Sequence, residues 1–382
     1  MEVSRTGRRG ALHLSGTLVA SAVALVQSAV LGRWLSVDDH GLVVGFIATV
    51  GALALLAQGG AVGAVVDARA RGGLDGAEAR GLALGLLAVP LTLTCAVAWW
   101  AGMLDVVGVV ALIGWVAWQV LGGLARADGR FAQWGTAQVA QAAGRLVATV
   151  FALLWAPTAA AATAAFAMGT WLGVAPLAPW VGRVARPAPE QWQRGRRFAQ
   201  HAGPWAVAMA VTERADVLML GVLGAAQADI ALAGVAIAVS QRTRLIPTAL
   251  GVALAVETEP KAGTLTRQAL RGAVATAVAL AVVGAVAVPW LWGAAYNDAV
   301  TLLWLSLPGQ VALGMVTVWG RIGQATHRGR RVAAVGLGAL VLHGVLAAVV
   351  WRGGGGVAGV VAAGSVAQMI SLALSRAVVV RK

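Results

Sequence analysis

Long runs of apolar residues, separated by short hydrophilic breaks, fill this sequence from one end to the other. A helix needs about 20 apolar residues to cross about 30 Å of hydrocarbon, and twelve of the runs are long enough. The pattern therefore predicts an all-α integral membrane protein with about twelve transmembrane helices. The predicted spans cover residues 11–32, 41–66, 81–103, 105–125, 132–155, 157–182, 203–225, 230–256, 269–295, 299–320, 332–351 and 355–375.

Positively charged residues are concentrated in every second hydrophilic break. These breaks and the two tails hold 23 of the 29 Lys and Arg residues, whereas the intervening breaks hold only Arg33 and Arg352. Basic residues beside a spanning helix resist translocation, so basic loops stay in the cytoplasm. Both termini are therefore predicted to be cytoplasmic, and the number of spans is predicted to be even. The basic segments are residues 5–9, 69–80, 126–130, 183–197, 261–271, 321–331 and 376–382.

The composition supports this assignment and excludes several other classes of protein. The mean hydropathy is +0.80 and only 12% of the residues are charged, which is too apolar for a soluble domain of this length. The basic loops account for the pI of about 11.7. Such loops are attracted to anionic lipids, so we expect membrane lipids and not nucleic acid as partners. Arg outnumbers Lys 27 to 2, and Ala, Gly and Val are abundant, which as a codon effect suggests a GC-rich bacterial genome. We therefore expect the bacterial plasma membrane as the location.

The chain offers none of the common signatures of an enzyme or a cofactor site. It has no GxxxxGK[ST] loop for nucleotide phosphates, no Cys/His cluster for a metal, and a single cysteine, Cys95. No loop is large enough to form a soluble catalytic domain. We therefore expect no cofactor, no metal and no enzymatic activity.

The longest hydrophilic segment divides the chain near its midpoint. Six predicted spans precede residues 183–201 and six follow, and the hairpin at 31–46 resembles the one at 220–236. Both halves begin on the cytoplasmic side, so the repeat is parallel and its pseudo-two-fold axis lies along the membrane normal. The alternative is that two short hairpins are similar without any repeat. The predicted organisation is a six-helix bundle at 1–182, a cytoplasmic basic linker at 183–201 and a second six-helix bundle at 202–382.

Charged residues near the middle of a span carry the candidate chemistry. Each costs about 2.5–3.5 kcal/mol to insert into hydrocarbon, so such residues usually have a function. In the span 203–225, Glu213 and Asp216 are three positions apart and are predicted to share a helix face, with Arg214 about 100° round. One of the two acids is our candidate for binding a proton or Na⁺ that is coupled to transport.

The next predicted span, 230–256, contains two further arginines. In a regular helix Gln241 and Arg244 share a face, whereas Arg242 and Arg244 lie about 200° apart. One interpretation is a cationic lumen between the two bundles, in which Arg214, Arg242 and Arg244 bind an anionic substrate. The alternative is that Arg242 or Arg244 neutralises one of the two acids of the preceding span.

The span 132–155 carries a polar stripe of Gln138, Gln141 and Arg145 at positions i, i+3 and i+7. The guanidinium of Arg145 has no acidic partner in the spans of its own half. Arginine binds phosphate through two parallel hydrogen bonds and keeps its charge in a low dielectric. Arg145 is therefore the leading candidate for holding a substrate phosphate, with the two glutamines beside it.

Other polar residues within the predicted spans have a simpler interpretation. Ser365, Gln368 and Ser371 form a line on the last span, and hydrogen bonding between helices is the commoner use of such a line. His343 stands alone on an apolar helix and is interpreted as a packing residue.

Three segments resemble the polysaccharide flippase branch (O-antigen and exopolysaccharide) of the MOP exporter superfamily, which is MATE-like. They are residues 29–60, with a leucine–small–Arg hairpin and a short Asp turn; 213–251, with Arg-x-Asp and Ile-Pro; and 304–331, followed by the glycine-rich 353–368. The resemblance implies a secondary transporter that flips polyprenyl-diphosphate-linked oligosaccharide across the bacterial plasma membrane for surface polysaccharide biosynthesis. It also implies possible partners, namely a polysaccharide polymerase and glycosyltransferases.

Two other functions remain open from the sequence. A drug or cation antiporter of the same superfamily would be expected to have acidic residues inside the N-terminal bundle, and none lies within those spans. A membrane glycosyltransferase could use Asp38 and Asp39 as acid and base or as metal ligands, although their loop is only a few residues long.

Overall fold

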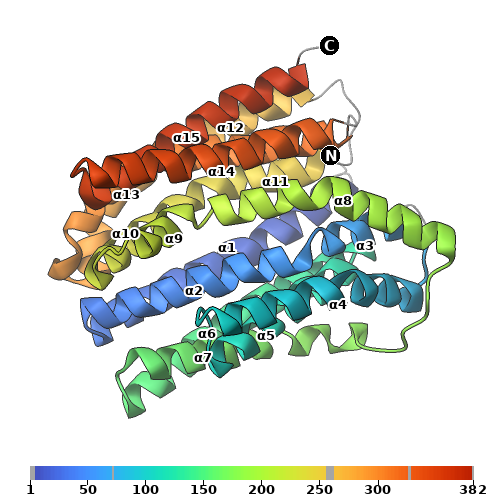
Figure 1. Cartoon of the computed structure of the whole chain (residues 1–382), viewed down its shortest axis with the longest axis horizontal. Helices are drawn as coiled ribbons and strands as arrows, with labels where there is room; N and C mark the ends of the chain where they lie inside the picture. Colours follow the sequence, from blue (N-terminus) through green and yellow to red (C-terminus); the bar gives the residue numbers. More distant parts are fainter. Residues whose placement is uncertain (1–4, 71–72, 255–261, 326–327, 381–382) are drawn as a thin grey trace. The chain divides into compact units, whose positions relative to one another are not determined.

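The computed structural model describes residues 5–70, 73–254, 262–325 and 328–380, and these residues are almost entirely helical (Figure 1). Within these ranges no residue forms a β-strand. The helices are α1 (Arg5–Trp34), α2 (Val37–Gln58), α3 (Ala61–Ala70), α4 (Gly76–Trp100), α5 (Val106–Ala127), α6 (Phe131–Trp155), α7 (Ala159–Leu172), η1 (Ala175–Trp180), α8 (Pro189–Thr212), α9 (Ala215–Val222), α10 (Gln227–Ser240), η2 (Gln241–Arg244), α11 (Leu245–Leu254), α12 (Ala262–Trp292), η4 (Ala294–Tyr296), α13 (Asp298–Ala325), α14 (Gly329–Arg352) and α15 (Gly356–Val380).

The predicted spans reappear as helices, some continuous and some broken. In the described part of the chain, nine helices are long and apolar enough to cross a membrane. The predicted spans 157–182, 203–225 and 230–256 each form two or three shorter helical pieces instead. The run at 41–66 also breaks, because Gly59 and Gly60 adopt positive φ angles of 49° and 87° between α2 and α3. The chain is therefore an all-α, multi-pass membrane protein, as the hydropathy pattern predicts.

Residue contacts divide the chain into two compact units. We call Met1–Gly10, Leu25–Ala48 and Val211–Lys382 the C-terminal unit, and Ala11–Ala24 and Thr49–Ala210 the N-terminal unit. The predicted bundle boundaries at residues 182 and 202 stay a prediction. The chain passes between the two contact-based units at several points, the last of them between Ala210 and Val211, and α8 begins at Pro189.

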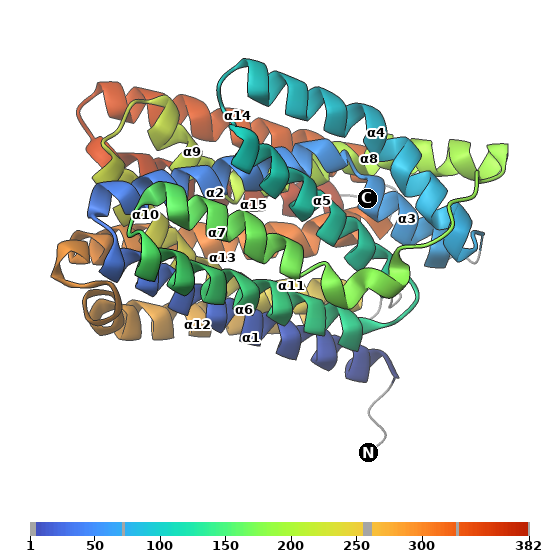
Figure 2. The same cartoon turned by 90° about the horizontal axis from the view of Figure 1, so that it is seen from below.

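Glycines set the closest helix contacts of the N-terminal unit. A Cβ atom on Gly169 of α7 would lie 2.4 Å from the Cα of Arg145, and one on Gly173 would lie 2.4 Å from the Cβ of Gln141. Figures 1 and 2 show α5, α6 and α7 side by side, in agreement with their contacts. The two glycines therefore hold α7 directly against the polar stripe of α6.

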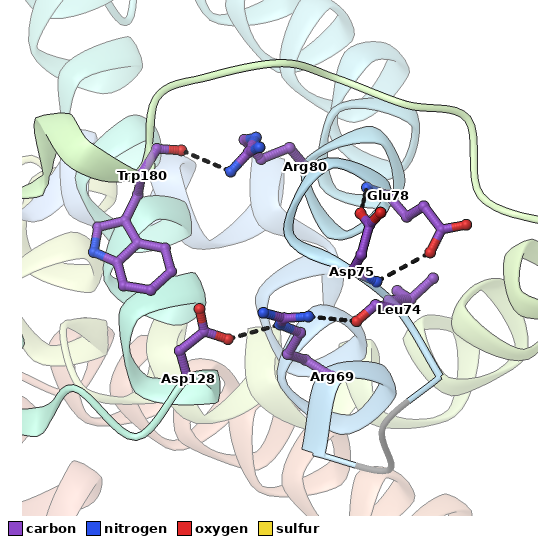
Figure 3. A network of polar contacts seen from close by, with 7 residues as sticks. All are labelled: Arg69, Leu74, Asp75, Glu78, Arg80, Asp128 and Trp180. Carbon is purple, nitrogen blue, oxygen red and sulfur yellow. Dashed lines mark hydrogen bonds and ion pairs between the residues drawn. The ribbon is translucent and has the colours of Figure 1, made fainter.

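Basic residues at the ends of several helices take part in a polar network within the N-terminal unit (Figure 3). Asp75 caps α4 in a reciprocal capping box with Glu78. The Nε of Arg69 lies 2.6 Å from the Asp128 carboxylate, and its Nη1 donates to the Leu74 carbonyl at 2.5 Å. The hydrogen bond to Asp128 raises the pKa of Arg69. Arg80 donates to the main-chain carbonyls of Trp180 and Arg183. These loop cations therefore link the ends of neighbouring helices, in addition to setting the predicted topology.

Helices α13, α14 and α15 form the centre of the C-terminal unit, and α15 contacts both of the others (Figure 1). The hairpin of residues 25–48 belongs to the same unit. Its closest approach is at Gly41, where an added Cβ would lie 1.9 Å from the Gln227 carbonyl oxygen. Deeper in the unit, the His40 ring contacts the hydroxyl of Tyr296 at 2.7 Å, and both side chains are buried.

The two aspartates considered for glycosyl transfer have structural hydrogen bonds. Asp38 accepts a hydrogen bond from the main-chain N–H of Ala228 at 3.1 Å, and Asp39 accepts one from the Ser36 hydroxyl at 2.9 Å. Among the described residues, no cluster of three or more metal-ligating side chains occurs. The carboxylates of Asp38 and Asp39 therefore order the turn that leads into α2.

Candidate functional site

A break in the seventh predicted span organises the charged residues of the C-terminal unit. α8 ends at Thr212 and α9 begins at Ala215, so Glu213 and Arg214 lie in the turn between them. The following span is interrupted as well, because Gln241–Arg244 forms the 3₁₀ turn η2 between α10 and α11. Two irregular backbone segments therefore meet inside one unit.

The carboxylate of Glu213 is the centre of the first cluster. It lies 2.8 Å from the Nη1 of Arg244, whose side chain is only 11% exposed, and 3.9 Å from the Nη1 of Arg214. The Gln241 side chain donates to the main-chain carbonyl of Glu213 at 3.0 Å. The predicted co-facial pair of Gln241 and Arg244 is confirmed, since both contact Glu213. The neutralising alternative is correct for Arg244, while Arg242 lies half-buried in the same 3₁₀ turn.

Asp216 lies in a second cluster, which corrects two predictions. Its Oδ1 is 3.0 Å from the Nε2 of His343 on α14, and both side chains are almost completely buried. The predicted shared face of Glu213 and Asp216 is wrong, because the helix break turns the two acids toward different helices. The prediction that His343 stands alone is also wrong. The two atoms are in close contact, but among the described residues neither of them makes a hydrogen bond.

A glycine makes room for this buried pair. A Cβ on Gly364 of α15 would lie 2.2 Å from the Oδ1 of Asp216 and 2.9 Å from the Nε2 of His343. The Asp216–His343 pair is thus enclosed by α9, α14 and α15.

The polar line on α15 continues from this pair. The Ser365 hydroxyl donates to the Leu305 carbonyl of α13 at 2.6 Å, which confirms the expected helix-to-helix hydrogen bond. A Cβ on Gly309 of α13 would lie 2.6 Å from the Gln368 Oε1. Among the described residues, the buried Oε1 atoms of Gln310 and Gln368 accept no hydrogen bond. The seam between α13 and α15 is therefore polar and close-packed.

Arg145 contacts a threonine hydroxyl and two aromatic rings in the N-terminal unit. Its Nε and Nη2 both donate to the Thr170 hydroxyl, at 3.1 and 3.0 Å. Its guanidinium carbon lies 4.0 Å from the ring centroid of Phe166 and 4.7 Å from that of Trp115. The side chain is fixed against α5 and α7, and its positive charge faces aromatic surfaces that favour a cation.

The two glutamines of the α6 stripe have different surroundings. Gln138 accepts a hydrogen bond from the Thr17 hydroxyl of α1 at 3.2 Å. Gln141 is 5% exposed and packs against Gly173, and its Nε2 makes no hydrogen bond within the described chain. The predicted stripe exists, but Gln138 contacts α1 whereas Gln141 and Arg145 contact α7.

Sequence reasoning overlooked several residues that shape these clusters. Trp115, Phe166 and Thr170 hold Arg145, and Gly364 encloses Asp216, yet none of them attracted notice in the sequence. Only Trp115 had a usable signal, because it lies in the middle of a predicted span and not at the interfacial end where tryptophan usually lies.

Comparison with known proteins identifies the fold. The structure is similar to the inward-facing conformation of a multidrug resistance MATE family transporter of the MOP superfamily, with a TM-score of 0.68, 15% identity and 96% coverage of both chains. It is equally similar to the lipid II flippase MurJ in an inward closed conformation, with a TM-score of 0.68, 10% identity and coverage of 96% of this chain and 86% of that chain. The chain has the MATE transporter fold.

A third similar structure is that of a MOP superfamily transporter from Pyrococcus furiosus. That protein is described as having a binding pocket of reverse polarity, which suggests a different function for it. The TM-score is 0.59 at 15% identity, with 98% of this chain and 93% of that chain covered. No family model and no curated protein sequence matches the chain. Because all the identities are low, the similarity establishes the fold, and the substrate must be argued from the site.

Proposed function

We propose that this protein is a secondary transporter that flips polyprenyl-diphosphate-linked oligosaccharide from the inner to the outer face of a bacterial plasma membrane, with both termini in the cytoplasm. Alternating access around a site at mid-membrane depth would move the head group while the lipid tail stays in the bilayer. It would not be an enzyme, and glycosyltransferases and a polysaccharide polymerase would supply and consume the lipid.

The surroundings of Arg145 carry this proposal. Its side chain contacts Thr170, Trp115 and Phe166, and none of these three groups carries a charge. Inserting the charge costs about 2.5–3.5 kcal/mol, which two cation–π contacts of about 0.5–2 kcal/mol each can partly offset. A diphosphate would bring two negatively charged groups to the guanidinium and match its geometry.

The neighbouring structures support a lipid substrate without deciding it. One of them is named as a lipid II flippase, so a head group on a lipid carrier is compatible with this fold. In the C-terminal unit, Arg214 and Arg242 are candidate phosphate ligands beside the Glu213–Arg244 pair. In the N-terminal unit, Arg145 is the candidate phosphate ligand, and Gln138 and Gln141 would hydrogen-bond a head group held there.

We assign the ion-coupling role to Asp216 and His343 within this proposal. Glu213 is paired with Arg244, whereas Asp216 faces the buried imidazole of His343. A proton bound at this pair would change the packing of α9 against α14 and α15. That change would bias the transporter between its inward-facing and outward-facing states.

A drug or cation antiporter of the same superfamily is the second candidate. The observation that favours it is the similarity to a multidrug resistance MATE transporter. An organic cation would be attracted by carboxylates, yet Glu213 and Asp216 already have cationic or imidazole partners. The charge of the site therefore favours an anionic substrate.

Complementation of a flippase-deleted bacterial host tests the proposal. Surface polysaccharide is measured with wild type, Arg145→Lys and Arg145→Met, each at matched membrane abundance. Methionine preserves most of the apolar volume and removes the charge, and lysine retains the charge but not the paired donors. We expect loss of polysaccharide with methionine and a weaker, partial signal with lysine. Full complementation by Arg145→Met would exclude this arginine as the phosphate ligand.

A further inference from the structure

An apolar groove of about 630 Å³ lies between three helices of the C-terminal unit. α13 contacts both α12 and α15, and the groove follows this junction. Its volume lies within the range of sites that hold a ligand of drug-like or acyl-chain size. It is lined by Val274, Ala277, Val278, Ala281, Trp304, Leu307, Pro308, Val311, Ala312, Met369 and Leu372.

Trp304 and Pro308 line the groove on the α13 side. The indole N–H of Trp304 donates to the Ala281 carbonyl at 3.0 Å, which fixes the ring across the junction of α12 and α13. Pro308, one turn further along α13, lacks the N–H that would bond the carbonyl of residue 304. The α12 side of the groove is lined by small alanine and valine side chains, which leave space beside α13.

The groove opens on the surface that faces lipid. Val278 is 60% exposed and Met369 is 45% exposed, although both lie in the middle of long apolar helices. A surface of this kind, in a span, contacts hydrocarbon chains and not water. An acyl chain therefore has the right chemistry to lie in it.

An arginine lies just beyond the lining residues on each of the two flanking helices, α12 and α15. On α12, Arg271 comes one turn before Val274, and on α15, Arg376 comes one turn after Leu372. Both arginines are exposed, and each is about 4.5–6 Å along its helix from the last lining residue. Both also belong to basic segments that the charge pattern assigns to the cytoplasmic side.

We propose that the groove holds one acyl chain of an anionic glycerophospholipid of the inner leaflet, with its phosphate bound between Arg271 and Arg376. The depth of the arginines favours this lipid over the transported one. They lie at the ends of the spans, where phospholipid head groups are, whereas the transported diphosphate must travel to the mid-membrane arginines. The proposal is independent of the flippase function, because it requires only the predicted orientation of the helices.

Photocrosslinking in nanodiscs tests the site. The full-length protein is reconstituted in phosphatidylcholine containing a small fraction of phosphatidylglycerol with a diazirine on one acyl chain. The matched probe is phosphatidylcholine with the same labelled chain. We expect the phosphatidylglycerol probe to label peptides covering residues 274–281 and 304–312 at least tenfold more strongly, since each interfacial arginine contributes about a fivefold preference for an anionic lipid.

Two sets of variants distinguish a built site from ordinary lipid contact. Arg271→Gln with Arg376→Gln should reduce phosphatidylglycerol labelling to the phosphatidylcholine level, whereas Arg330→Gln, an exposed arginine on the cytoplasmic end of α14, should leave it unchanged. Ala277→Trp should block labelling by filling the groove, and Ala275→Trp on the same helix outside the groove should not. Ala281→Leu is the milder filling variant if Ala277→Trp fails to yield monodisperse protein.

Each contrary outcome overturns the proposal in an identifiable way. Equal labelling by the two probes would mean that the groove contacts bulk lipid without selection. Displacement of the probe by an equimolar polyprenyl phosphate, but not by phosphatidylglycerol, would mean that the groove holds the transported lipid. Full flipping by Arg145→Met would refute the phosphate role of Arg145 and leave the labelling result untouched, so the two proposals fail separately.

Discussion

A methyl group added at Gly364 should act directly on the buried Asp216–His343 pair. The Cβ of Gly364→Ala would lie 2.2 Å from the Asp216 Oδ1 and 2.9 Å from the His343 Nε2. Real Cβ contacts of this kind do not occur below 3.0 Å, so the carboxylate oxygen must retreat by about 0.8 Å. The substitution therefore separates the pair without removing either titratable group.

The size of the effect follows from this overlap. Forcing one methyl group into a packed core costs typically about 1–3 kcal/mol, so we expect the protein to stay folded with a lowered Tm. The Asp216–His343 contact at 3.0 Å should lengthen or rotate away. If this pair couples a proton to transport, the initial transport rate should fall by tenfold or more and lose its dependence on an imposed pH gradient.

The assay is transport into proteoliposomes with and without a pH gradient, using two matched glycine controls. Gly338→Ala lies on α14, the helix of His343, and Gly221→Ala lies on α9, the helix of Asp216. An added Cβ at either control position meets no atom within 4 Å. Both controls should transport as wild type. If Gly364→Ala also retains the wild-type response to the pH gradient, the pair is structural and the coupling assignment is refuted.

Two further predictions concern topology and the inner loops. In a Cys95→Ala background, Ala101→Cys should react with an impermeant maleimide from outside intact cells and Gln193→Cys should not; the opposite pattern would reverse the orientation. Asp128→Asn should lower the Tm in detergent by about 2 °C or less, because the ion pair with Arg69 is about a quarter exposed. Asp128 raises the pKa of Arg69, which is already far above neutral, so the loss of Tm should be the same at every pH from about 6 to 9. A loss of Tm that disappears toward pH 9 would contradict the Asp128–Arg69 ion pair.

The hydropathy pattern was sufficient for the fold because each span satisfies its own backbone hydrogen bonds. It was insufficient where a span breaks. Glu213 and Arg214 form a turn with no proline or glycine beside them, so regular helix geometry wrongly placed Glu213 and Asp216 on one face. In η2, by contrast, Gln241 and Arg244 still meet Glu213 as helical spacing predicts, because a short 3₁₀ turn changes their directions only modestly.

The sequence also did not reveal which residues from distant parts of the chain contact one another. His343 follows Asp216 by more than a hundred residues, and no periodicity connects α9 with α14. The same applies to Arg145, whose contacts on α5 and α7 depend on how tightly Gly169 lets two helices approach. Composition and spacing identified the costly charges, and tertiary packing decided which of them are neutralised.

Flipping by the purified protein is the most direct test of the account. Proteoliposomes carrying a fluorescent polyprenyl-diphosphate oligosaccharide are assayed for appearance of the sugar on the opposite leaflet, with an organic cation dye as the competing cargo. The account predicts flipping by the wild type, loss with Arg145→Met, partial activity with Arg145→Lys, and no transport of the dye. Dye transport without lipid flipping, unaffected by Arg145→Met, would contradict it and identify the protein as a cation antiporter.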